Sequence, residues 1–79
     1  MTIDKLIKMA NQIGAFFEAM PDRRQAMADI AGHIQRSWDP KMRGVLLAHL
    51  DAQPSADGGL KPIVSEAVRT HRKALEGRA

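Results

Sequence analysis

The sequence contains no cysteine, no tyrosine, one tryptophan and two phenylalanines among its 79 residues. The absence of cysteine excludes disulfides, cysteine-ligated zinc, iron–sulfur clusters and a thiol nucleophile. A chain of this length buries only about 60% of its unfolded surface, so its core is small. Small domains commonly gain stability from a disulfide, a metal or a partner. We therefore expect one small domain over residues 1–79 that is completed by a partner.

Long apolar runs are also missing. No segment approaches the roughly 18 consecutive apolar residues that cross a membrane, and residues 1–5 lack the start of a signal peptide. The chain is too short to enclose a substrate pocket of about 300 Å³ or more within its own walls. These absences predict a cytoplasmic protein that contacts no membrane and is not an enzyme on its own.

Apolar residues recur at intervals of three and four, and no segment alternates as a strand does. The predicted fold is all-α, a small helical bundle of about four helices. The predicted helices are 3–20, 22–38, 40–52 and 61–75. Residues 53–59, rich in turn formers, are expected to form a loop, and residues 76–79 are expected to fray.

Polar residues and prolines mark the predicted helix boundaries. Thr2 and Asp22 are predicted N-caps, and Gln25 follows Asp22 at the spacing of a capping box. Pro21 is expected to end the first helix. Asp39 precedes Pro40, a pair typical of an N-cap followed by the first helical residue.

The apolar faces of the first and third helices are wider than a helical bundle requires. Met9 and Phe16 lie about 90° from the centre of the first apolar face on a helical wheel. Leu47 widens the third face in the same way. The excess has two interpretations, an unequal core in which these helices are central or a surface that docks on another protein.

The most distinctive local segment is residues 38–43, with the sequence WDPKMR. The Trp38 indole is expected to cover the end of the bundle, although tryptophan is also enriched at binding hot spots. Arg43 is expected outside the core and therefore at an interface.

The charged residues and histidines do not form the pattern of a nucleic-acid interface, a metal site or a catalytic site. The positive excess is greatest at Arg69, Arg72 and Lys73, where cations complement the negative end of a helix dipole. These cations are not interleaved with aromatic residues as in a nucleic-acid interface. The histidines lack metal-ligand spacing, and His49 is expected to be a hydrogen-bonded residue of the core or an interface. We expect no catalytic residue, no metal site and no cofactor site in this chain.

Six segments together resemble one family. They are IDKLIKMANQIG (3–14), FF (16–17), MPDR (20–23), DIAGHI (29–34), WDPKMR (38–43) and GLKPIV (59–64). In this order they resemble the delta subunit of cytoplasmic NAD-dependent, molybdenum-containing formate dehydrogenases of bacteria. The resemblance extends over about residues 3–70.

The resemblance implies a non-catalytic subunit that stabilises or assembles a larger enzyme. Its partner would be the large catalytic (alpha) subunit, with beta and gamma subunits in the same complex. Those partners would carry bis-molybdopterin guanine dinucleotide, iron–sulfur clusters and FMN. The complex would oxidise formate to carbon dioxide and reduce NAD, and the delta chain itself would bind no cofactor.

Off-core or polar positions, together with the corner segment, give the predicted partner-binding residues. They are Met9, Phe16, Trp38, Asp39, Arg43, His49 and Lys61. Two other functions stay open. One is a self-sufficient small helical protein that binds nucleic acid or is regulatory. The other is a maturation chaperone that leaves the finished enzyme.

Overall fold

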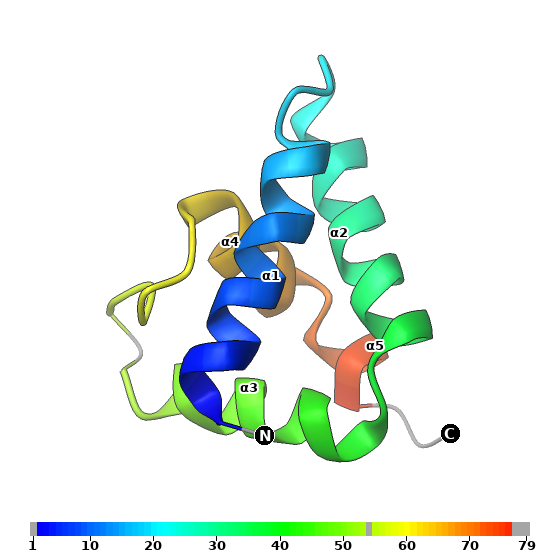
Figure 1. Ribbon diagram of the computed structural model, residues 1–79. Helices are drawn as coiled ribbons and strands as arrows, with labels where there is room; N and C mark the ends of the chain where they lie inside the picture. Colours follow the sequence, from blue (N-terminus) through cyan, green and yellow to red (C-terminus); the bar gives the residue numbers. More distant parts are fainter. Residues whose placement is uncertain (1, 54, 77–79) are drawn as a thin grey trace.

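The computed structural model describes residues 2–53 and 55–76, which contain five α-helices and no strand (Figure 1). The helices are α1 (Ile3–Phe17), α2 (Arg23–Ser37), α3 (Pro40–Asp51), α4 (Pro62–Thr70) and α5 (Arg72–Glu76). The predicted all-α class is confirmed. None of the described helices is long and apolar enough to cross a membrane.

The helices α1 and α3 begin at the predicted caps. The Thr2 hydroxyl accepts a hydrogen bond from the Lys5 backbone N–H at 3.2 Å. The Asp39 carboxylate accepts one from the Met42 N–H at 2.8 Å, and Pro40 occupies the start of α3. Each cap satisfies a backbone donor that has no partner within the first turn of its helix.

Asp22 caps α2, but the predicted capping box is not formed as expected. The Asp22 carboxylate accepts hydrogen bonds from the Arg24 and Gln25 N–H groups at 3.0 and 3.3 Å. The Gln25 side chain donates instead to Asp29 Oδ1, one turn farther along α2, at 2.9 Å. This half of the prediction is wrong because a partner on the next turn engages the Gln25 amide.

The first helix is shorter than predicted. It ends at Phe17, and a turn closed by a hydrogen bond from Met20 N–H to Phe17 O, 3.0 Å long, follows it. In a continued helix the ring of Pro21 would clash with the carbonyl of Phe17, four residues earlier, and Pro21 has no N–H to donate to that carbonyl. The proline therefore ends the helix several residues upstream of itself.

The predicted fourth helix is two helices. At His71 the backbone leaves the helical region, with φ −104° and ψ 27°. The break lets α5 turn toward α3, where Leu75 is buried and Arg72 reaches Asp51. Residues 77–79 of the predicted frayed end lie outside the described part, whereas Glu76 is the last residue of α5.

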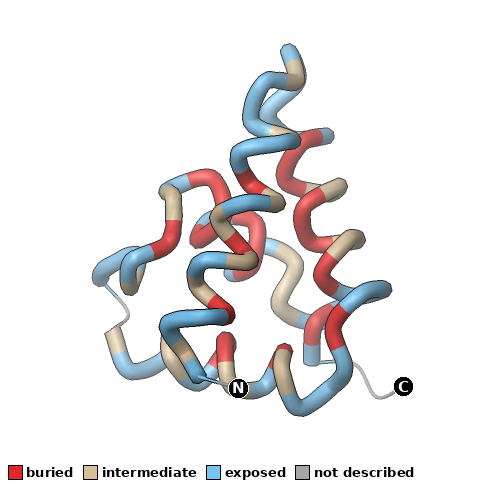
Figure 2. Tube along the Cα trace, viewed as in Figure 1, coloured by how far each residue is buried: buried red, intermediate tan, exposed pale blue. Residues whose placement is uncertain are grey.

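The core lies where α4 packs against the α1–α2 pair, with α3 and α5 closing one end (Figures 1 and 2). Its fully buried members include Leu6, Ile30, Ile34, Leu46, Val64 and Val68. Gly14 is buried on α1, and a Cβ built on it would overlap Val64 Cγ2 of α4. The absence of a side chain at Gly14 lets these two helices approach closely.

The segment between α3 and α4 is attached to α1 by Asn11. The Asn11 amide donates to the Gly59 carbonyl at 3.0 Å, and its carbonyl oxygen accepts from the Lys61 N–H at 2.8 Å. The Lys61 side chain makes no cap hydrogen bond to α4. Asn11 therefore fixes the chain where it enters α4.

Candidate docking site

The predicted partner-binding residues lie in three separate regions. Phe16 is at the end of α1 that is distant from α3, and Met9 lies two turns before it (Figure 1). Trp38, Asp39 and Arg43 form the corner between α2 and α3. His49 and Lys61 lie beside the segment that joins α3 to α4.

Phe16 is the candidate with the most accessible apolar surface. It is 77% exposed, and it is the one large apolar side chain among the described residues that is mostly exposed. Its ring meets the Phe17 ring edge to face, with centroids 5.0 Å apart and planes at 88°. Phe17 lies next to His33 of α2, with ring centroids 6.4 Å apart. Phe16 thus sits on a partly buried aromatic support.

Phe16 belongs to a wider exposed apolar region, which we call the hairpin tip. The hairpin tip consists of Ala15, Phe16, Ala19 and Pro21, all of which are exposed. It lies where α1 and α2 project beyond α4, and Figure 2 shows this end largely in pale blue. Exposed apolar residues that gather in one place are typical of protein-interaction sites.

Met9 does not extend this exposed region. It is half-buried and packs against the hydrophobic core. The prediction that Met9 lies off the core is therefore wrong. The wide apolar face of α1 therefore packs against the core at Met9 and is exposed at Phe16, and docking through Phe16 stays a prediction.

At the corner, Trp38 is a core residue. Its side chain is 4% exposed, and its backbone N–H donates to Ile34 O at 2.9 Å to close α2. Trp38 therefore belongs to the hydrophobic core, as its structural interpretation implied. Asp39 is exposed and caps α3.

Arg43 is buried, and the expectation that it lies outside the core is wrong. Only 5% of the residue is exposed. At 100° per residue, position 43 falls in the same stripe of α3 as Leu46, Leu47 and Leu50, all of which are buried. Its Nε atom is enclosed without a hydrogen-bond partner.

His49 and Lys61 hold the segment between α3 and α4. His49 Nε2 lies 2.8 Å from the Gly58 carbonyl oxygen, to which it donates. Lys61 Nζ forms an ion pair with Oε1 of Glu18, the C-cap residue of α1, at 3.3 Å. The predicted hydrogen bonding of His49 is confirmed, and the contribution of both residues to partner binding stays a prediction.

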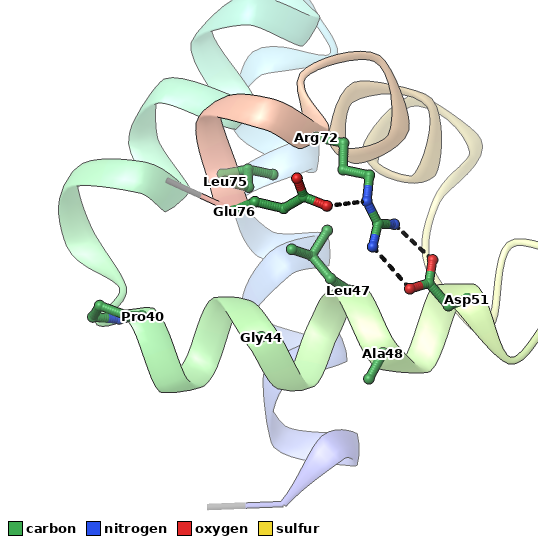
Figure 3. Close-up of a pocket in the computed structure, with 8 residues that line it drawn as sticks. All are labelled: Pro40, Gly44, Leu47, Ala48, Asp51, Arg72, Leu75 and Glu76. Atoms are coloured by element: carbon green, nitrogen blue, oxygen red, sulfur yellow. Dashed lines mark hydrogen bonds and ion pairs between the residues drawn. The ribbon is translucent and has the colours of Figure 1, made fainter. Parts of the chain in front are cut away.

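A shallow groove of about 320 Å³ runs between α3 and α5 (Figure 3). At its edge the Arg72 guanidinium donates to both oxygens of Asp51, at 2.6 and 2.8 Å, and to Glu76. These hydrogen bonds lower the pKa of Asp51 below its usual value and raise that of Arg72. Arg72 was expected to complement a helix dipole, and in the structure it forms ion pairs with two carboxylates.

Replacing Asp51 with asparagine is expected to lower the melting temperature modestly at pH 7 and by less near pH 2. The pKa of Asp51 is lower in the folded state, so its contribution is present above about pH 4 and is lost on acidification. Thermal unfolding followed by circular dichroism between about pH 2 and pH 7 tests this prediction. Asp57→Asn, in the exposed loop, is the control. An equal effect of Asp51→Asn at both pH values would contradict the ion-pair explanation.

Within residues 2–53 and 55–76, no three side chains of histidine, aspartate or glutamate are grouped to hold a metal ion.

A family model described as the NADH-dependent formate dehydrogenase delta subunit FdsD matches residues 5–68. No curated protein and no solved structure matches the chain.

Proposed function

Because the chain belongs to the FdsD family of formate dehydrogenase delta subunits, we propose that it is a non-catalytic subunit that docks on the large catalytic subunit. In this proposal the chain stabilises or assembles a bacterial, cytoplasmic, NAD-dependent enzyme that oxidises formate to carbon dioxide. The other subunits carry bis-molybdopterin guanine dinucleotide, iron–sulfur clusters and FMN, and this chain binds none of them.

The observation that carries the docking proposal is the exposure of Phe16. A phenylalanine that is 77% exposed leaves apolar area in contact with water. Transfer of such area into an interface contributes about 25 cal/mol per Å². The ring also meets the ring of Phe17 edge to face. The hairpin tip therefore supplies an apolar anchor for a partner.

Phe16→Asp is expected to weaken binding to the catalytic subunit by more than about tenfold. A carboxylate at this position would be desolvated in an apolar interface without a partner, which costs more than about 1.4 kcal/mol. The measurement is co-purification of the co-expressed subunits, followed by titration of the separated ones. Because Phe16 is exposed, the isolated variant should unfold at nearly the wild-type temperature.

The matched control is Ala56→Asp, which adds the same charge at an exposed position between α3 and α4. This control should bind as the wild type does. Equal binding by Phe16→Asp and Ala56→Asp would remove the hairpin tip from the interface. A fixed ratio of this chain to the catalytic subunit in the purified active enzyme would distinguish a resident subunit from a chaperone that departs.

A further inference from the structure

Arg43 is a buried cation for which the described part of the chain supplies no anion. The residue is 5% exposed, and its Nε atom is enclosed without a hydrogen-bond partner. No carboxylate of residues 2–53 and 55–76 forms an ion pair with it; the ion pairs found there involve Arg23, Lys61 and Arg72. The two terminal nitrogens of the guanidinium are not fully enclosed in the same way.

The carboxylates closest to Arg43 along the chain and on α5 have other partners. Asp39 lies one turn before Arg43, and its Oδ1 accepts the Met42 N–H that starts α3. Asp51 and Glu76 both accept hydrogen bonds from Arg72. None of these three carboxylates forms an ion pair with Arg43.

An unpaired buried guanidinium is costly. Arginine keeps its proton under all ordinary conditions, so it cannot escape the cost of burial by becoming neutral. Leu46, Leu47 and Leu50 occupy the same stripe of α3, and an apolar residue at position 43 would pack there without a desolvation penalty. The folded chain thus carries a charge that destabilises it unless an anion arrives from outside.

We propose that Arg43 binds an aspartate or glutamate side chain of the large catalytic subunit. The inference rests on the docking function proposed above and names the chemistry of a second contact, at the corner between α2 and α3. A planar guanidinium pairs with a carboxylate through two parallel hydrogen bonds. Because the guanidinium is already largely desolvated, most of the cost of burying this cation has been met before the partner binds.

The test replaces Arg43 with methionine and measures two quantities that should move in opposite directions. The melting temperature of the isolated full-length chain should rise by about 4 °C or more, since an unpaired buried charge is removed. Binding to the catalytic subunit should weaken by at least about 30-fold, since a partner carboxylate would lose its cation. Arg43→Lys keeps the charge without the two-pronged geometry and should bind with intermediate strength.

The control is Arg36→Met, which removes the same charge from an exposed position on α2 and should change neither quantity appreciably. If Arg43→Met lowers both stability and binding, Arg43 has a structural role and the inference is overturned. Wild-type binding by Arg43→Met overturns it as well. Stabilisation of the wild type, but not of Arg43→Met, by millimolar acetate or formate would assign the site to a small anion instead. Failure of the wild-type chain itself to bind would refute the docking function, a result visible before any variant is compared.

Discussion

Trp38→Ala is expected to leave most of the isolated chain unfolded at 25 °C. The indole is 4% exposed and belongs to the hydrophobic core. Removing a buried tryptophan side chain costs about 3–5 kcal/mol, because the transfer free energy is lost and a cavity remains. A core of this size contributes about 3–5 kcal/mol in total. Urea denaturation followed by far-ultraviolet circular dichroism measures the loss.

Trp38→Phe is the control for this prediction. It keeps an aromatic ring in the same space and should retain most of the helical signal. A folded Trp38→Ala chain within about 1 kcal/mol of the wild type would mean that the indole is not part of the core. Loss of partner binding by Trp38→Ala would not by itself place Trp38 in an interface, because an unfolded chain also fails to bind.

Gly14→Val is expected to destabilise the fold by about 3 kcal/mol. A Cβ at this position would overlap Val64 Cγ2, and Val64 is fully buried on α4. Val64 is branched at Cβ and has few alternative rotamers, so α1 and α4 would have to separate. The measurement is again the free energy of unfolding from urea titration.

Gly44→Val is the matched control, because a Cβ at Gly44 of α3 would meet nothing within 4 Å. The control should lie within about 0.5 kcal/mol of the wild type, since glycine and valine differ little at an exposed helical position. Equal losses for the two variants would contradict the explanation that the close approach of α1 to α4 determines the effect.

The features that the sequence predicted well depend on neighbouring residues. Thr2, Asp22 and Asp39 were identifiable as caps because a cap bonds to a backbone N–H two or three positions away. The helical class followed from the spacing of apolar residues, which a short window reveals. The helical wheel placed Phe16 off the core correctly, but the same angle placed Met9 off the core wrongly.

The features that the sequence did not predict depend on distant residues. The break at His71 follows the packing of α5 against α3, and the Asp51–Arg72 pair joins residues 21 positions apart. Asn11 bonds to residues 48 and 50 positions later, so no local pattern singled it out. Arg43 was misplaced because arginine is rarely buried without a partner. Its position in the leucine stripe of α3 was the signal that could have revealed it.

The position of α4 in the chain has a consequence for biosynthesis. Leu60, Ile63, Val64 and Val68 complete the core, yet they belong to the last quarter of the sequence. At about 5–20 residues per second, a ribosome takes on the order of a second to add this segment. Until then the surfaces of α1 and α2 that pack against α4 in the folded chain cannot be covered by it. The fold can therefore be completed only after translation has passed α4.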